Sequence, residues 1–347
     1  MLLAADVGGT KTLLGLFEPD ARRPARVRVG EFVTLAYDGP VPMVREFLAA
    51  ARVEATRIDA AAFGVAGAVS HQVARLTNVP WLVDAAAIQK AAGFRCVGLI
   101  NDLEAMAHSV MVLEPAELAE LQAGTRQPRG NAAVIAAGTG LGQALLHRLD
   151  GRFVPAASEA GHADWGARTV REIELLQALT RLFGRVDVET VISGPGLVNI
   201  YQFTHDAFGT TPYVSGTARV PRRLCEGVGA VTDPAMLPAA ISQSAMAGRC
   251  PQCVEALDIF IAAYGAEAGN LALRSVASAG VYVGGGIAPK ILPALRTPAF
   301  LDAFRAKTPM ADFAAAIPIA VILNPEAGLL GAAVYAHTLA MNPERCG

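Results

Sequence analysis

Two short glycine turns contain the residue types that bind phosphate groups. The segment Asp6-Val7-Gly8-Gly9-Thr10-Lys11-Thr12 stands between two apolar runs, and Gly138-Thr139-Gly140 also follows an apolar run. Glycine backbones adopt unusual φ/ψ angles and approach a ligand closely. In the first turn the N–H groups, the Thr10 hydroxyl and the Lys11 ammonium can face one anion. Each turn alone is equally typical of a plain β-hairpin, but two matching turns favour phosphate binding.

A third glycine segment, Gly284-Gly285-Gly286, follows the apolar run Val281–Val283. A nucleoside can lie flat against such a backbone. A tight turn from a strand into a helix explains the three glycines almost as well, and Pro289 fits the first turn of that helix.

A carboxylate suited to general-base chemistry follows a short apolar strand. Asn101 and Asp102 come directly after Val97–Ile100, and ligands of open α/β sheets bind at the carboxyl ends of strands. A carboxylate there can accept the proton of an alcohol while a phosphoryl group is transferred to the alcohol oxygen. The alternative is that Asn101 or Asp102 simply caps the helix that follows.

The loop Ser158–Trp165 brings two acids, an imidazole and an aromatic ring close together in the sequence. Within it Glu159 and His162 can form hydrogen bonds with sugar hydroxyls, and Glu189 is a further candidate. The alternatives are a polar surface loop and, for Glu189, an exposed helix end. A metal site at Glu159-x-x-His162 lacks a third ligand that the sequence indicates.

Two similar α/β halves are expected to position these residues, because Ala4–Thr10 resembles Ile135–Gly140. The polar stretch Glu114–Gly130 separates them. We therefore expect a small domain at 1–113, with the C-terminal helix 327–340 packing back on it, and a large domain at 114–326. Strands are expected at 2–5, 13–17, 27–35, 60–65, 69–76, 97–100, 132–136, 144–149, 152–156, 281–283 and 317–323, helices at 41–52, 82–92, 103–113, 169–182, 254–276 and 327–339, and a loop at 209–223.

Composition excludes several classes of protein. The 347 residues are 53% apolar, and 29 basic and 31 acidic side chains give a formal charge of −2, which argues against general nucleic-acid binding. The apolar stretch Val254–Val276 contains enough polar residues to be an amphipathic helix instead of a membrane span. No signal-peptide pattern is visible.

The cysteines indicate the cellular compartment of the protein. They are odd in number, five, and show no framework spacing, so we expect a reducing cytosol. Cys250-Pro-Gln-Cys253 has the spacing of half a zinc knuckle. No second Cys/His pair stands at a plausible distance, so a free-thiol pair is favoured over a metal site.

Six segments in this order resemble bacterial glucokinase, the hexokinase-type group of the actin-like ATPase superfamily. The resemblance covers nearly the whole chain and implies two ribonuclease H-like domains with a cleft between them. The segments are Asp6-Val7-Gly8-Gly9-Thr10, Ile100-Asn101-Asp102, Ala137-Gly138-Thr139-Gly140-Leu141-Gly142, Ser158-Glu159-Ala160-Gly161-His162, Ser193-Gly194-Pro195-Gly196-Leu197-Val198-Asn199 and Gly284-Gly285-Gly286-Ile287.

The resemblance also implies roles for the candidate residues. Asp102 looks like the base that deprotonates the sugar 6-hydroxyl. The implied glucose ligands are Asn101, Glu159, His162 and Glu189, with Thr139 beside them. The implied nucleotide site comprises Asp6, Gly8, Gly9, Thr10, Lys11, Gly138, Thr139, Gly140, Gly284, Gly285 and Gly286, with Mg²⁺ arriving on the ATP.

The expected activity is therefore phosphorylation of D-glucose by ATP to glucose 6-phosphate, feeding glycolysis in the cytoplasm. The resemblance implies a homodimer and no membrane or nucleic-acid partner. A kinase for another hexose or for an N-acetylated amino sugar is the first alternative. An inactive sugar-sensing regulator is the second, and it is disfavoured because no helix-turn-helix precedes Asp6.

Two departures from the family pattern qualify the resemblance. Lys11-Thr12 is more similar to the related repressor–kinase sugar family, whose members carry a Cys-rich zinc motif after a Gly-His pair. Here no Cys cluster follows Gly161-His162 within a few dozen residues, so that motif is not expected. Ala160 replaces a glycine common in glucokinases, a change too small to abolish binding.

Overall fold

The computed structural model describes residues 1–20, 22–76, 79–207, 224–342, 344 and 346. Its contacts divide the chain into two compact units. The first consists of Met1–Glu117, Arg152–Ala157 and Asn324–Gly347, and the second of Leu118–Gly151 and Ser158–Leu323. The predicted loop at 209–223 lies outside the described residues.

The first unit is built on a five-stranded sheet with the order β3-β2-β1-β4-β8. β1, β2 and β3 form an antiparallel meander, and β4 and β8 continue the sheet parallel to β1. Three short strands, β5, β6 and β7, form a separate small sheet. The elements of this unit are β1 (Leu2–Val7), β2 (Lys11–Glu18), β3 (Ala25–Val33), α1 (Pro40–Ala51), β4 (Ala60–Val65), β5 (Val69–Ser70), β6 (Val73–Arg75), β7 (Leu82–Asp84), α2 (Ala85–Ala92), β8 (Val97–Asn101), α3 (Asp102–Ser109) and α11 (Ala327–Met341).

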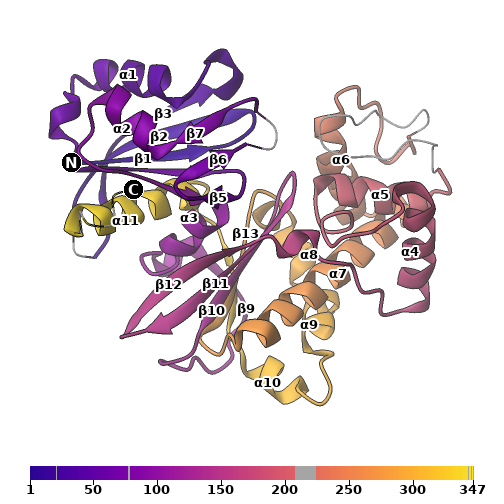
Figure 1. Cartoon of the computed structure of the whole chain (residues 1–347). Coiled ribbons are helices and arrows are strands. Elements are labelled where there is room, and N and C mark those ends of the chain that lie inside the picture. The colour runs from indigo at the N-terminus through magenta and orange to yellow at the C-terminus, as the bar shows by residue number, and fades with distance from the viewer. Residues whose placement is uncertain (21, 77–78, 208–223, 343, 345, 347) are drawn as a thin grey trace. The chain divides into compact units, whose positions relative to one another are not determined.

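Alternating side chains of β1 face two separate apolar layers. Leu3 and Ala5 pack in the layer that contains α1 and α2, whereas Leu2 and Ala4 pack in the layer that contains α3 and α11. Figure 1 shows α11, in yellow, beside β1 at the opposite end of the chain. The C-terminal helix is therefore part of the core of the first unit, because its buried alanines and Leu329 cover one face of the sheet.

The second unit repeats this strand arrangement. β10 pairs antiparallel with β11 and parallel with β13, as β1 pairs with β2 and β4, and β14 continues parallel to β13. The six-stranded sheet has the order β12-β11-β10-β13-β14-β9. The internal repeat predicted from the glycine turns is confirmed by this pairing. The strands of this sheet are β9 (Leu118–Gln122), β10 (Ala132–Ala137), β11 (Leu141–Leu149), β12 (Arg152–Ser158), β13 (Gly280–Gly284) and β14 (Ile319–Ile322), and residues 152–157 of β12 are the ones grouped with the first unit.

The core of the second unit surrounds α7, a long helix whose side chains are mostly buried. Residues of α5, α6 and α9 pack in the same apolar cluster. The helices are α4 (Val170–Phe183), α5 (Gly194–Thr204), α6 (Leu237–Met246), α7 (Pro251–Ser275), α8 (Leu292–Leu295), α9 (Pro298–Arg305) and α10 (Ala311–Ala316). Among the residues that the structure describes, no helix is long and apolar enough to cross a membrane.

Two predicted elements differ from the structure for local reasons. The helix expected at 82–92 begins only at Ala85, because the Asp84 side chain accepts a hydrogen bond from Ala87 N at 3.1 Å and ends the short strand β7 there. The single strand expected at 69–76 is a hairpin of β5 and β6, whose turn residues His71 and Gln72 have positive φ. In the polar stretch 114–130, β9 pairs with β14.

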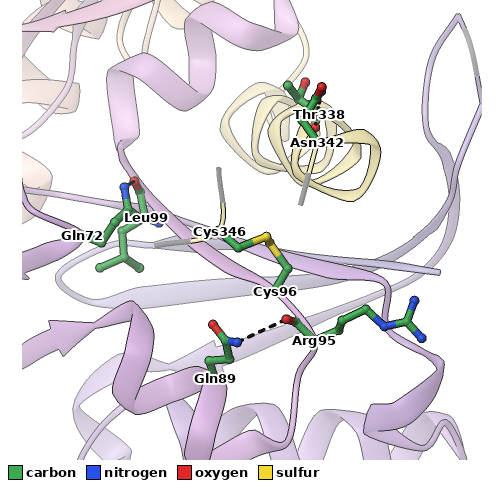
Figure 2. Close-up of a disulfide and its surroundings, with 8 residues drawn as sticks. All are labelled: Gln72, Gln89, Arg95, Cys96, Leu99, Thr338, Asn342 and Cys346. Atoms are coloured by element: carbon green, nitrogen blue, oxygen red, sulfur yellow. Dashed lines mark hydrogen bonds between the residues drawn. A yellow bond between two sulfur atoms is a disulfide. The ribbon is translucent and has the colours of Figure 1, made fainter. Parts of the chain in front are cut away.

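A disulfide joins Cys96, directly before β8, to Cys346 near the end of the chain (Figure 2). Their Cα atoms are 5.3 Å apart, although 250 residues separate them in sequence. Cys96 lies in an apolar cluster with Leu339 of α11, so the packing of that helix brings the two cysteines together. The odd cysteine count predicted no disulfide framework, and for this pair the prediction is wrong because no spacing pattern reveals so distant a partner.

Candidate functional site

In the first unit, the candidate residues lie at the carboxyl ends of β1 and β8, the two strands on either side of β4. Asp6 of β1 is in register with Gly64 of β4, which is in register with Ile100 of β8. Neighbouring strands are about 4.8 Å apart, so the Cα atoms of Asp6 and Ile100 are about 10 Å apart. Asn101 and Asp102 follow at once, which puts both acids on the edge of the sheet where ligands bind in such folds.

Asn101 and Asp102 form the start of α3. Asn101 is buried, and its Oδ1 accepts a hydrogen bond from Leu103 N at 2.8 Å, while its Nδ2 donates to the Gly67 carbonyl at 3.1 Å. Asp102 Oδ1 accepts from Leu103 N at 2.9 Å. The capping alternative is therefore correct for Asn101, but it does not compete with a role in binding. The cap fixes the pair, and the positive end of the helix favours the charged Asp102 carboxylate.

Asp6 is a half-buried carboxylate beside the start of α11. A Cβ atom added to Gly328 would lie 2.8 Å from Asp6 Oδ2, so a larger residue there would push the carboxylate away. Burial raises the pKa of Asp6 to about 6, and the nearby charge of Lys11 partly opposes the shift. A divalent cation nearby would favour the charged form and oppose this shift.

The turn Gly8–Thr10 is a β-hairpin turn held by its own backbone. Gly8 N donates to the Lys11 carbonyl at 3.0 Å, and a Cβ on Gly8 would lie 2.8 Å from that oxygen. Neither Gly8 nor Gly9 has positive φ, so the glycine at position 8 is explained by close approach and not by an unusual backbone conformation. Lys11 forms an exposed ion pair with Glu31 at 2.8 Å. The ion pair therefore joins a side chain of β2 to a side chain of β3.

In the second unit, Glu189 connects the sugar candidates to the second glycine turn. Its Oε2 accepts a hydrogen bond from Leu141 N at 2.8 Å, directly after Gly138–Gly140. Its own N–H donates to the Gly161 carbonyl at 2.9 Å, next to His162. A Cβ on Gly140 would collide with the Glu189 carboxylate, so a larger residue there would displace that side chain. Glu189 is therefore bound to the site and is not an exposed helix end.

His162 pairs with an acid that the sequence did not single out. Its Nδ1 lies 3.1 Å from Asp187 Oδ2, and this hydrogen bond raises the pKa of His162. Burial alone would raise the pKa of Asp187, but hydrogen bonds from Thr190 and His162 outweigh burial and lower it. The backbone explains the pairing, since Trp165 N donates to Val186 O and Val188 N to Ala163 O. Asp187 thus orients the imidazole, leaving Nε2 for a ligand.

The third glycine segment lies beside the second glycine turn. Gly284 at the end of β13 is in register with Ala136 of β10. Gly285 has a φ of +83°, and a Cβ there would collide with the Ala137 carbonyl. The buried Tyr264 hydroxyl accepts from Ala137 N at 3.1 Å and lies 3.4 Å from the Gly284 carbonyl. Both turns are thereby held by one side chain of α7.

The start of α5 contacts the same turn. Gly194 N donates to the Gly138 carbonyl at 2.8 Å, and Ser193 caps the helix by accepting from Gly196 N at 2.9 Å. The positive end of a helix therefore lies at the candidate phosphate loop, which favours an anion there. Thr139 and Glu159 are exposed on this side, and Glu159 has no capping hydrogen bond.

The structure thus gathers His162, Glu189 and the glycine segments of the second unit, and separately Asp6, Asn101 and Asp102 of the first. Sequence reasoning missed Asp187 and Tyr264. An acid just upstream of Glu189 was a usable signal for Asp187. No local pattern indicated Tyr264, which lies in the middle of α7 and forms hydrogen bonds with the backbone of both glycine turns.

The comparison with known proteins identifies the family. A family model described as Glucokinase matches residues 3–339. The chain belongs to the glucokinase family. Glucokinase from a Nostoc species is 38% identical over 344 residues, which are 98% of this chain and 99% of that protein. Glucokinase from Stenotrophomonas maltophilia is 34% identical, with coverage of 96% and 94%. The predicted resemblance is confirmed, and with it the assignment to ATP-dependent hexose kinases.

Solved structures confirm the fold. The crystal structure of glucokinase from an Antarctic psychrotroph matches with a TM-score of 0.81 and 28% identity, covering 97% of this chain and 98% of that one. A ROK family glucokinase from Streptomyces griseus, solved with glucose and AMPPNP, matches with a TM-score of 0.62 and 20% identity, covering 97% and 99%. The predicted class, two ribonuclease H-like domains of the actin-like ATPase type, is that of these glucokinase structures.

Proposed function

We propose that this glucokinase-family chain transfers the γ-phosphoryl group of ATP to the 6-hydroxyl of D-glucose. The observation that carries the proposal is the double contact of Glu189. One hydrogen bond ties it to the glycine turn at Gly138–Gly140 and the other to the loop that holds His162. A kinase must hold the acceptor hydroxyl and the phosphate groups in a fixed relative position, because phosphoryl transfer depends mainly on positioning.

Asp102 is the proposed base. It accepts the proton of the 6-hydroxyl as that oxygen forms its bond to phosphorus. Its hydrogen bond from Leu103 N and its place in the first turn of α3 support this role, because both stabilise the carboxylate form that a base requires.

The proposed sugar-binding residues are Asn101, Glu159, His162, Glu189 and Thr139. The cap and the Gly67 contact fix the Asn101 amide, so one N–H of its Nδ2 stays available for a hydroxyl. The contact with Asp187 fixes the His162 ring. Fixed donors and acceptors of this kind discriminate strongly against sugars that lack the matching hydroxyl.

The glycine segments are the proposed nucleotide site. Gly8, Gly9, Thr10 and Lys11 are assigned to one phosphate loop, Gly138, Thr139 and Gly140 to the other, and Gly284, Gly285 and Gly286 to the adenosine. Magnesium bound to the nucleotide supplies charge neutralisation between the phosphates. Asp6 would hold that ion through water, a role supported by its buried carboxylate. The Lys11 ammonium, which pairs with Glu31 in this structure, is assigned to phosphate on the resemblance.

Three further assignments rest on the family. We propose a small domain at 1–113 with 327–340 and a large domain at 114–326. We also propose a cytoplasmic location, because glucose 6-phosphate enters glycolysis there, and a homodimer, which is the form that the resemblance implies.

A coupled kinase assay tests the proposed function. Glucose, mannose, fructose and N-acetylglucosamine are each offered with ATP, ADP and polyphosphate. We expect the highest kcat/KM for glucose with ATP. A higher kcat/KM for another sugar, or for another donor, would replace the substrate assignment by the alternative that the assay favours.

A further inference from the structure

Three cysteines and a histidine meet in the second unit, on residues other than the candidate kinase residues. The cluster consists of His205, Cys225, Cys250 and Cys253, and one ligand atom from each lies within 4.8 Å of all the others. The three cysteines are free thiols. The sequence indicated no second Cys/His pair at a plausible distance from Cys250 and Cys253, but folding brings His205 and Cys225 beside them.

Two distances within the cluster are close to those of a four-coordinate zinc site. Zn–S and Zn–N bonds of about 2.3 and 2.0 Å in a tetrahedron separate neighbouring ligand atoms by about 3.5 to 3.8 Å. His205 Nε2 lies 3.3 Å from Cys250 Sγ, and Cys225 Sγ lies 3.6 Å from Cys253 Sγ. We propose that these four residues bind a structural Zn²⁺ ion.

The neighbouring residues hold the histidine and the cysteines as ligands. His205 Nδ1 lies 2.9 Å from the Tyr201 carbonyl, which fixes the tautomer with the proton on Nδ1 and leaves Nε2 free to coordinate. The Tyr201 hydroxyl accepts from Cys225 N at 3.0 Å. One tyrosine therefore orients two of the four ligands.

Cys250 and Cys253 occupy the start of α7. Cys250 is the N-cap residue and Cys253 lies in the first turn, so the two thiols are close together at one end of the helix. Both are buried, while His205 and Cys225 are half-buried. Three thiolates and an imidazole form a soft donor set that suits zinc and not magnesium or calcium, which prefer oxygen ligands. Four protein ligands fill a tetrahedron, as in structural and not catalytic zinc sites.

The cluster differs from the zinc motif expected of the sister family. In the sister family that motif follows a Gly-His pair. The corresponding pair here is Gly161-His162, and its histidine forms a hydrogen bond with Asp187. The new site instead joins the end of α5, where His205 is the C-cap, to the start of α7. Since the other end of α5 donates from Gly194 to Gly138, the metal would anchor the far end of the helix that contacts the candidate phosphate loop.

Metal analysis of the purified full-length chain tests the proposal independently of kinase activity. The protein is prepared with a reductant and without chelator or affinity metal, and its zinc is measured by plasma mass spectrometry. We expect about one zinc per chain. Titration of the thiols with a mercurial should release that zinc to a colorimetric chelator. Cobalt substitution should give thiolate charge-transfer and tetrahedral d–d bands.

Three variants localise the metal. Cys253→Ser should lose the zinc, whereas His205→Cys, which keeps four soft ligands, should retain it. Cys346→Ser is the matched control outside the cluster and should keep full zinc. If Cys253→Ser does not fold, the cobalt spectrum of the wild-type chain and of His205→Cys decides. A wild-type chain without zinc and without tetrahedral cobalt bands overturns the proposal, as does a Cys225–Cys253 disulfide in peptide maps of protein prepared without reductant.

Discussion

Removing the Glu189 carboxylate should weaken the use of ATP as well as of glucose. In Glu189→Ala, Leu141 N loses a charge-assisted hydrogen bond of 2.8 Å next to Gly138–Gly140. Such bonds contribute about 1.5–3 kcal/mol. At about 1.4 kcal/mol per tenfold change, kcat/KM for ATP should fall about 10- to 150-fold, with a further loss for glucose.

Two other variants separate the functions of Glu189. Glu189→Gln keeps an acceptor for Leu141 N, so its loss for ATP should be smaller, about 2- to 10-fold for a neutral hydrogen bond. Glu174→Ala removes an exposed carboxylate of α4 paired with Arg171 and should leave both constants unchanged. Steady-state kinetics with each substrate varied gives these values. An unchanged kcat/KM for ATP in Glu189→Ala would refute the coupling inferred from the Leu141 contact.

Three further perturbations address the charges and the disulfide. Because the hydrogen bond to Asp187 raises the pKa of His162, this ion pair stabilises the folded state at pH values below the ordinary histidine pKa. The stabilisation is lost as pH rises through the raised pKa of His162. In Asp187→Asn, NMR titration should show a lower pKa for His162 than in the wild-type chain. Burial raises the pKa of Asp6 to about 6, so the folded state loses stability as pH rises from about 4 to 6. Asp6→Asn removes the buried charge, so its free energy of unfolding, measured in urea at pH 7, should be higher by about 1–3 kcal/mol, while kinase activity is lost. Equal or lower stability would contradict the burial argument. Cys346→Ser should lower the free energy of unfolding by about 2–4 kcal/mol, and a free thiol at Cys96 in peptide maps of the unreduced wild-type chain would contradict the disulfide.

Local sequence signals predicted the parts of the site that local geometry builds. The hairpin turn at Gly8–Thr10, the helix that Asn101 caps and the repeated turn at Gly138–Gly140 each follow from apolar runs broken by glycine or a capping residue. Capping and binding were posed as alternatives at Asn101, but one residue can do both, because the cap uses Oδ1 while Nδ2 points elsewhere.

Partners distant in sequence could not be predicted in the same way. The Cys96–Cys346 disulfide depends on the packing of α11 in the first unit. The cluster of three cysteines and His205 depends on the contact between α5 and α7. Asp187 pairs with His162 only because two loop segments exchange backbone hydrogen bonds. Such contacts carry no periodicity or spacing in the chain.

The turnover of Asp102→Asn, measured with its affinity for glucose, tests the central claim most directly. Asparagine keeps the size of the side chain and an acceptor for Leu103 N but cannot accept the 6-hydroxyl proton. We expect turnover to fall by about 10²- to 10⁴-fold while the glucose Kd from calorimetry stays unchanged. Near-normal turnover with unchanged glucose binding would contradict the assignment of Asp102 as the base.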